Sequence, residues 1–476
     1  MIATLKKRYI GSRSFYRVLL AVAVPIMIQN GITQFVGMLD NIMVGRVGTE
    51  QMTGVSIANT LVFVFNLAVF GAVSGAGIFG AQFYGSGSNE GVRSAFRFKL
   101  LICAALTAIG FAAFLLLDDP LIMLYLRGEG SPQEIAASLG YAKEYLHILL
   151  IGLAPFVLTQ CYAGTLRECG QTVVPMVAGV VSVLVNLLCN AMLIFGLLGF
   201  PALGSAGAAI ATVIARFVEL AIVALWAHLH PNKCPYLVSA YRTLRIPKGL
   251  FSRILRKTLP LMINETLWAG GMALLSQAYS VHGYDVVAAD NICRTISNVF
   301  SVSFIAMGNA IGIIVGQLLG ANKMKEAVDS NRKLIFFAVV ICVFIGGTMA
   351  AVAPLYPHIY NTTDAVRSLA AKFIVIAGLC MPINSLASAC YFTLRSGGKT
   401  LITFFFDSFY VCVLTVPLAM LLTHAVGVSI VPLYLICQLV DLGKCAVGIV
   451  LIKKGVWIHN IVEEQNHEGH SILSEA

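Results

Sequence analysis

The 476-residue chain has little charge: only 11% of its residues are Asp, Glu, Lys or Arg, against about 25% in an average soluble domain. Hydrophobic residues make up 58% of the sequence, and the mean hydropathy is +0.85. A soluble protein of this length must cover itself with polar side chains, which this composition does not supply. Soluble enzymes, secreted domains, nucleic-acid binders and disordered proteins are therefore nearly excluded.

Motifs of catalysis and metal binding are also missing. The twelve cysteines occur singly, without a CxxC pair, so we expect neither a zinc site nor a disulfide framework and interpret them as small buried apolar residues. No HExxH, GxSxG or P-loop motif and no loop-borne pair of carboxylates occurs. The sequence therefore predicts no enzyme and no cofactor.

What the sequence does have is long apolar runs. A helix needs about 20 apolar residues to cross the hydrocarbon of a bilayer, and the run from Tyr16 to Val44 is too long for a cleaved signal peptide. We predict an all-α integral membrane protein with twelve transmembrane helices, several of them kinked at Pro25, Pro155, Pro260, Pro382 and Pro417. The predicted spans are 16–45, 51–82, 95–117, 138–162, 172–197, 205–229, 255–283, 286–318, 331–352, 366–394, 400–423 and 427–452.

Basic residues gather on alternate loops. With the N-terminus inside the cell, most of the 32 Lys and Arg residues fall on the inner side, as the positive-inside rule requires. This predicts an even number of spans in the plasma membrane, with both termini cytoplasmic. The net charge of +10 then reports topology, and no nucleic-acid partner is expected.

The two halves of the chain resemble each other at an offset of 235 residues, which later slips to 228. Each half has six predicted spans, so we expect two pseudo-symmetric six-helix bundles, as in transporters built from repeats. The expected divisions are an N-terminal lobe 1–229, a cytoplasmic linker 230–254, a C-terminal lobe 255–455 and a cytoplasmic tail 456–476. The matching blocks begin at Pro25 and Pro260, Ile57 and Ile292, Gln82 and Gln317, and Leu166 and Leu394.

Polar residues in the first lobe suggest a cation site. Asp40 lies in the first span, and charge at that depth is costly enough to mark a functional candidate. The alternative is a carboxylate at the water interface that serves only topology. Asn186 and Asn190 share a helix face, and with Thr212 they could orient a carboxylate from another helix, or simply hold helices together.

In the second lobe, Glu265 lies five residues after Pro260, with Trp268 one turn further on. A carboxylate beside an aromatic face suits an organic cation; the alternative is an acid near the cytoplasmic entrance. Asp407 has no partner close in sequence and is either a second-lobe proton or substrate site or a buried hydrogen-bonded acid. Three further acid–base neighbours are expected to pair structurally: Arg216 with Glu219, Asp290 with Arg294, and Asp441 with Lys444.

An ordered set of motifs resembles multidrug and toxic compound extrusion (MATE) transporters over nearly all of residues 15–455. Pro25 and Leu39-Asp-Asn-Ile-Met-Val-Gly45 resemble the family's first helix. Leu166-Arg-Glu-Cys-Gly-Gln-Thr172 and its repeat resemble the loops after helices 4 and 10. Asn186-Leu-Leu-Cys-Asn190, followed by the segment 204–212, is similar to the helix 5–6 pattern.

The resemblance implies efflux of amphipathic, often cationic compounds in exchange for inward H⁺ or Na⁺. It places the cation site at Asp40, Asn186, Asn190 and Thr212, and a helix bend at Pro25. Position 190 is commonly Asp in the family, and Asn190 weakens the case for tight Na⁺ binding, because hard cations favour charged oxygens. The sodium-linked branch carries two C-lobe acids, of which Glu265 matches one and Asn384 replaces the other.

The sequence therefore predicts an antiporter for small organic cations, which works as a monomer in the lipid bilayer. The candidate substrate-binding residues of the second lobe are Glu265, Trp268, Asn384 and Asp407. The coupling ion stays open between H⁺ and Na⁺, with Asp40 or Glu265 as the residues that would hold Na⁺. A flippase for lipid-linked oligosaccharides is the alternative, although it would favour a cationic cavity. A membrane-embedded enzyme would need a loop-borne acidic or metal cluster.

Overall fold

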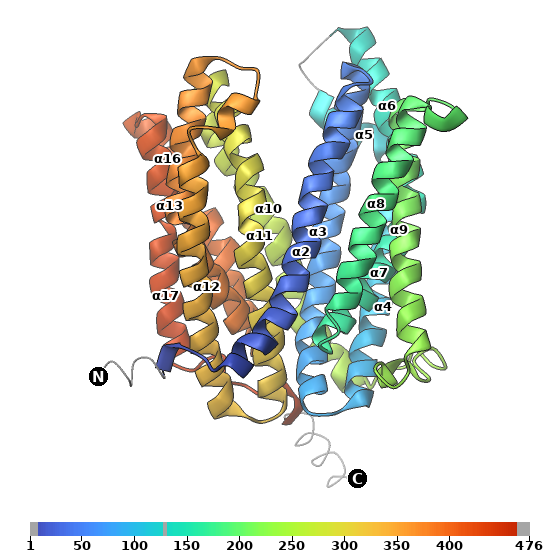
Figure 1. Ribbon diagram of the computed structural model, residues 1–476, viewed down its shortest axis with the longest axis vertical. Coiled ribbons are helices and arrows are strands. Elements are labelled where there is room, and N and C mark those ends of the chain that lie inside the picture. Colours follow the sequence, from blue (N-terminus) through green and yellow to red (C-terminus); the bar gives the residue numbers. More distant parts are fainter. Residues whose placement is uncertain (1–7, 127–130, 464–476) are drawn as a thin grey trace. The chain divides into compact units, whose positions relative to one another are not determined.

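The computed structural model describes residues 8–126 and 131–463, apart from the side chains of Met38, Asn41, Ile42 and Leu198. In these ranges all regular elements are helical (Figure 1). The N-half, which we define as the chain before α10, contains α2 (Arg13–Gly45), α3 (Thr49–Gly85), α4 (Asn89–Leu116), α5 (Asp118–Leu126), α6 (Pro132–Ile151), α7 (Leu153–Glu168), α8 (Val173–Phe195), η1 (Leu197–Gly199), α9 (Gly204–Leu229) and η2 (Pro235–Leu237).

The C-half begins at α10 and ends with the chain. It contains α10 (Lys248–Ser280), α11 (Tyr284–Gly320), α12 (Met324–Val352), η3 (Tyr356–Ile359), α13 (Asp364–Ser396), α14 (Thr400–Phe404), the π-helical turns η4 (Phe405–Phe409) and η5 (Val411–Thr415), α15 (Val416–Leu421), the π-helical turn η6 (Leu422–Val426), α16 (Ile430–Leu439) and α17 (Asp441–Lys453).

The twelve predicted spans are confirmed as helices or runs of consecutive helices. Within the described residues, ten helices are long and apolar enough to cross a membrane, and the bent pair α6–α7 makes eleven. The remaining predicted span, 255–283, lies in α10, which is not among these helices; it is 33 residues long and carries Arg253, Arg256 and Lys257 in its first part. These charges make α10 the most polar of the spans, although its length is ample.

Breaks in the helices follow only some of the predicted prolines. The fourth span bends by 47° between α6 and α7 at Gly152, three residues before Pro155. Pro25, Pro260 and Pro382 instead lie inside α2, α10 and α13, which continue through them. Membrane helices tolerate proline, because neighbouring groups can satisfy the freed backbone carbonyls. Near Pro417 the chain turns π-helical, which widens the turns on both sides.

The chain forms two compact units. One comprises the residues up to Met27, Ala81–Ser88 and those from Leu255 onward; the other comprises Ile28–Gly80 and Asn89–Ile254. Helix α2 therefore passes from one unit to the other two residues after Pro25. The linker 230–254 belongs to the second unit.

Two arginines of α4 fix this linker. Arg93 Nε donates to the carbonyl of Tyr236 at 3.1 Å. Arg97 donates to the carbonyl of Ala240 at 2.8 Å and to that of Ser239 at 2.9 Å. Because both guanidinium groups bind backbone oxygens, the linker is an ordered part of the N-half.

In the first unit, α11, α12 and α13 lie side by side (Figure 1). Glycines allow the close approach of α12 and α13: a Cβ on Gly346 would overlap the carbonyl oxygen of Gly378. The core between the helices is apolar, and the rings of Phe373 and Tyr434 stack with their centroids 4.4 Å apart. In the second unit, α8 and α9 lie side by side in the same way.

The segment after α17 packs into the first unit. Trp457 is 1% exposed and Ile461 is 3% exposed. The buried Gln82 amide accepts from the Ile461 N–H at 2.8 Å and donates to the carbonyl of Ser396 at 2.9 Å. Residues 456–463 of the predicted tail are thus anchored, whereas 464–476 lie outside the described residues.

Candidate functional site

The four polar residues predicted for the first lobe come together from three helices, and we call them the N-half cluster: Asp40 of α2, Asn186 and Asn190 of α8, and Thr212 of α9. Asn190 Nδ2 donates to Asp40 Oδ1 at 2.6 Å and to Asn186 Oδ1 at 3.1 Å. Asn186 Nδ2 donates to Thr212 Oγ1 at 3.4 Å. The spacing of four residues in α8 puts both amides on the face that meets Asp40.

No ion pair neutralises Asp40 among the described residues, and its side chain is half-buried. Its hydrogen-bond partner Asn190 is fully buried, and Asn190 Oδ1 has no partner of its own. A buried carbonyl oxygen beside a carboxylate is a free acceptor for a proton-bearing group or a cation.

The amide of Asn186 also lies against the Asp40 carboxylate. When the amide is turned by half a rotation, its nitrogen donates to Asp40 Oδ1 at 3.0 Å and to Oδ2 at 3.1 Å. In this orientation both ends of the amide are satisfied, and Asn186 is a hydrogen-bond donor to the Asp40 carboxylate.

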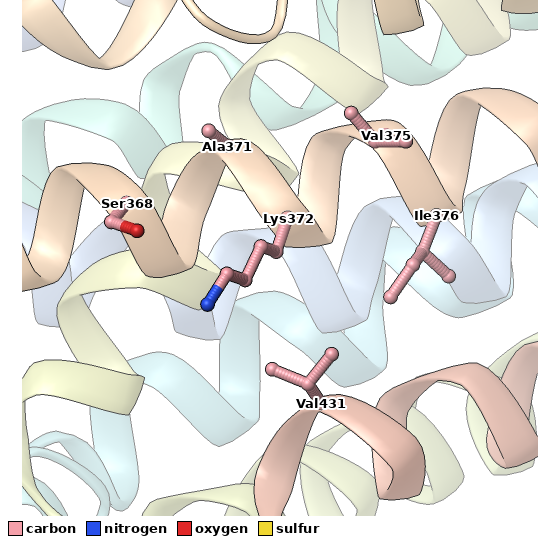
Figure 2. A pocket seen from close by; sticks show the side chains of 6 residues that line it. All are labelled: Ser368, Ala371, Lys372, Val375, Ile376 and Val431. Carbon is pink, nitrogen blue, oxygen red and sulfur yellow. The ribbon is translucent and has the colours of Figure 1, made fainter.

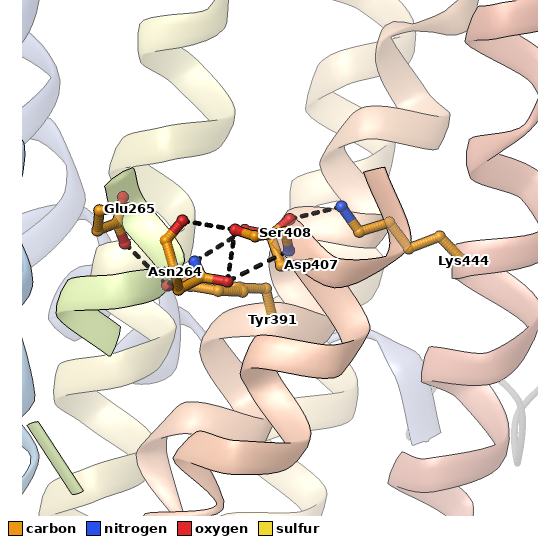
Figure 3. Close-up of polar contacts among 6 residues, drawn as sticks. All are labelled: Asn264, Glu265, Tyr391, Asp407, Ser408 and Lys444. Carbon is orange, nitrogen blue, oxygen red and sulfur yellow. Dashed lines mark hydrogen bonds and ion pairs between the residues drawn. The ribbon is translucent and has the colours of Figure 1, made fainter. Parts of the chain in front are cut away.

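A second polar cluster lies in the C-half (Figure 3): Asn264, Glu265, Tyr391, Asp407, Ser408 and Lys444, which we call the C-half cluster. At its centre is the buried amide of Asn264, which donates to Asp407 Oδ2 at 3.1 Å. Its carbonyl oxygen accepts from Ser408 Oγ at 2.7 Å and from the Ser408 N–H at 3.2 Å. The π-helical turn η4 presents both Asp407 and Ser408 to α10. Sequence reasoning missed Asn264, although it adjoins Glu265.

Asp407 forms an ion pair with a lysine that is distant in the sequence. Lys444 Nζ of α17 lies 2.5 Å from Asp407 Oδ1, and the two side chains are 8% and 18% exposed. The same ammonium lies 5.6 Å from the ring centre of Phe406. The expected ion pair of Lys444 with Asp441, three residues earlier, is therefore wrong as a contact, because the ammonium reaches across to η4 instead.

Glu265 has a different surrounding. Its Oε1 accepts from the Tyr391 hydroxyl at 3.0 Å, and no ion pair forms at this carboxylate within the described residues. Trp268, one turn on, is 38% exposed. Asn384 is half-buried in α13, and no hydrogen bond in the described ranges joins it to the cluster.

Among the other expected pairs, Arg294 Nε binds Asp290 Oδ2 at 2.7 Å, as predicted. The guanidinium carbon of Arg216 lies 5.1 Å from the ring centre of Phe156. Among the described residues, Arg216 forms no ion pair with Glu219.

One ion pair was missed from the sequence. Lys99 of α4 is fully buried, and its Nζ lies 2.6 and 2.7 Å from the two oxygens of Glu168. Thr165 Oγ1 accepts a third hydrogen bond from the same ammonium at 2.9 Å. Space for Glu168 comes from Gly80, where a Cβ would overlap Glu168 Oε2.

Two apolar grooves share no lining residue with either cluster. The one in Figure 2 has a volume of about 430 Å³ and is lined by five residues of α13, including Lys372, and by Val431 of α16. The other, of about 550 Å³, is lined by α4 and α7. In the described part of the chain, no group of three or more His, Cys, Asp or Glu side chains could hold a metal ion.

Comparison with known families gives two matches to one model. The MatE model matches residues 25–192 and again 260–421. The two matches begin at Pro25 and Pro260, at the offset of 235 residues seen in the sequence, so they confirm the internal repeat.

Relatives and solved structures agree with this match. The chain is 25% identical to the probable multidrug resistance protein NorM of Thermotoga maritima over 80% of each chain. It is 24% identical to the probable multidrug resistance protein YoeA of Bacillus subtilis over 86% of this chain and 88% of that one.

Among solved structures, an outward-facing multidrug resistance MATE family transporter of the MOP superfamily superposes with a TM-score of 0.83 and 18% identity, covering 94% of this chain and 97% of the other. A MOP superfamily transporter from Pyrococcus furiosus superposes with a TM-score of 0.82 and 17% identity, covering 95% and 97%. At these identities the structures establish the shared twelve-helix fold.

Proposed function

The chain belongs to the MatE family, and on this premise we propose that it is a secondary active antiporter that exports amphipathic organic cations in exchange for H⁺ or Na⁺. The multidrug resistance relatives support export of small molecules. We place the protein in the plasma membrane with both termini cytoplasmic, following the distribution of Lys and Arg.

The single observation that carries this proposal is that Asp40 forms no ion pair in the part of the chain that the structure describes. A carboxylate at membrane depth whose neighbours are amides and a hydroxyl is suited to take up a proton or Na⁺ and release it again. Occupancy of Asp40 would bias the transporter between its two states only by binding them with different affinity. Pro25 lies near the point where α2 changes unit, so a bend there would act on the helix that carries Asp40.

We place the binding site for the cargo at Glu265 and the exposed ring of Trp268. An organic cation gains from both the carboxylate and the aromatic face. The C-half cluster has two acids and one lysine. Its net charge is therefore negative when all three are ionised, which favours a cation over the pyrophosphate of a lipid-linked sugar. We therefore prefer the antiporter over the flippase.

The test is ethidium efflux from proteoliposomes with pH and Na⁺ gradients imposed separately. We expect Asp40→Asn to abolish gradient-driven efflux, because the amide cannot exchange a proton, while ethidium still binds. Glu265→Gln should weaken ethidium binding at least about tenfold, the effect of losing a buried charge partner.

The matched control is Glu326→Gln, which removes an exposed carboxylate, 62% exposed in its pair with Lys323. It should leave efflux unchanged. Full gradient-driven efflux by both the Asp40 and the Glu265 variants, at equal expression, would contradict the proposal.

A further inference from the structure

The C-half cluster holds two carboxylates whose surroundings differ sharply. Asp407 is saturated: Oδ1 contacts the Lys444 ammonium at 2.5 Å, and Oδ2 accepts from Asn264 at 3.1 Å. Glu265 accepts from the neutral hydroxyl of Tyr391 and has no ion pair in the described part of the chain. Asp407 therefore has little capacity for a further cation, whereas Glu265 is engaged by no ion pair among the described residues.

Two other charged groups surround the cluster. Arg395 of α13 lies over the ring of Tyr391 at 6.0 Å, and it acts on Glu265 at longer range. Asp441 lies one helical turn before Lys444 and interacts electrostatically with it. The three acids Glu265, Asp407 and Asp441 thus exceed the two bases Lys444 and Arg395 by one charge when all are ionised.

We propose that Lys444 is a built-in counter-ion that occupies Asp407 in place of cargo, so that the C-half cluster selects organic cations with one positive charge over those with two. The inference rests on the proposed function, and it names the charge class of the cargo. A second charge on the cargo would have to leave water without a carboxylate to receive it, which is costly at a buried site.

A purely structural ion pair makes a different prediction. If the pair only held α17 against η4, replacing it by neutral side chains would change stability and leave charge selectivity alone. Removing one member leaves the other buried and unpaired, which destabilises strongly. A cycle of single and double variants separates the two roles, because the double variant restores the net charge of the wild type.

The experiment measures binding and gradient-driven transport of ethidium, a monocation, and of propidium, which has the same ring system and a second quaternary ammonium. The full-length protein is reconstituted as wild type, Lys444→Met, Asp407→Asn and the double variant. Wild type should prefer ethidium. Lys444→Met frees Asp407 and should shift the propidium-to-ethidium affinity ratio upward by about tenfold or more, as expected for one added charge nearby.

The other two variants keep the test decisive if Lys444→Met does not fold. Asp407→Asn leaves an unpaired ammonium beside the site and should weaken ethidium binding by about tenfold. The double variant should recover both the ethidium affinity and the preference of the wild type. If the pair acted through packing alone, the propidium-to-ethidium ratio would stay at the wild-type value in every folded variant, the single variants included.

Two outcomes would overturn the idea, and they are distinct. Transport of neither dye by the wild type in any gradient contradicts the proposed function itself. Transport of ethidium with the same propidium ratio in all folded variants leaves the antiporter standing and removes the role of Lys444.

Discussion

The two halves share a fold and a repeated sequence, yet their polar clusters are built from different positions. Asp40 lies fifteen residues after Pro25, whereas Glu265 lies five residues after Pro260. At the repeat offset, the counterpart of Asp40 is the buried Leu275, and that of Glu265 is Asn30. Duplication therefore preserved the helices and not the acids, as expected if the two halves perform different tasks.

A second comparison concerns the buried ends of α7 and α13. Thr165 and Thr393 correspond at the offset of 228. Each of these hydroxyls forms a hydrogen bond with a polar residue in the third predicted span of the same half. In the N-half that residue is Lys99, which also binds Glu168. In the C-half, Thr393 Oγ1 donates to Asn331 Oδ1 at 2.8 Å. The buried contact at Thr165 in the N-half thus includes an ion pair, which we call the ionic corner, and the contact at Thr393 in the C-half joins two neutral side chains, which we call the neutral corner.

We expect the largest loss of stability from removing the ion pair between Lys99 and Glu168, the ionic corner. Lys99→Met leaves Glu168 buried without its ammonium, and loss of one member of a buried pair costs about 3–5 kcal/mol. Thermal unfolding of the purified protein in detergent should show a marked drop in the midpoint. Because neutral isosteres often replace such pairs well, Lys99→Met with Glu168→Gln should recover most of the loss.

The neutral corner supplies the control. Asn331→Ala removes one buried hydrogen bond and should cost about 1–3 kcal/mol, less than Lys99→Met. If the two single variants were equally stable, the contrast between an ionic and a neutral corner would carry no energetic meaning.

The sequence predicted the helices and the N-half cluster better than the C-half cluster. Long apolar runs fix the spans, and the spacing of Asn186 and Asn190 puts both on one helix face. Contacts between distant segments leave no such pattern: Lys444 and Asp407 are 37 residues apart, and Lys99 and Glu168 are 69 apart. The π-helical turn that presents Asp407 also has no periodicity to reveal it.

A smaller effect sharpens the comparison of the clusters. Asn190→Asp would give the N-half cluster a second carboxylate beside Asp40 without any lysine to offset it. Hard cations favour charged oxygen ligands, so we expect tighter Na⁺ binding by about tenfold and Na⁺-stimulated efflux. Asn361→Asp is the control, because this exposed amide lies in the loop between η3 and α13, outside the predicted spans. Efflux that stays indifferent to Na⁺ in the Asn190 variant would separate the N-half cluster from ion coupling.

The smallest effect concerns Asp118, which ties the start of α5 to α6 in the N-half. Burial opposes its charge, but hydrogen bonds from the Asp119 N–H at 2.7 Å, from Lys143 and from His147 at 3.0 Å outweigh it and lower its pKa. An acid of the C-half, Asp364 at the start of α13, is 94% exposed and forms an ion pair with Arg367 on its own helix. Asp118 is thus the tertiary contact and Asp364 the local one.

A carboxylate with a lowered pKa stabilises the fold at pH above its unfolded value of about 3.9, and this contribution disappears as the pH falls through the folded pKa. We expect Asp118→Asn to cost about 1 kcal/mol or less at pH 7, with the difference from wild type shrinking below pH 4. Thermal unfolding across that pH range measures it, with Asp364→Asn as the control that should change nothing. A loss at the Asp118 variant that persists unchanged at low pH would assign the effect to packing and not to charge, and the two acids would then differ only in burial.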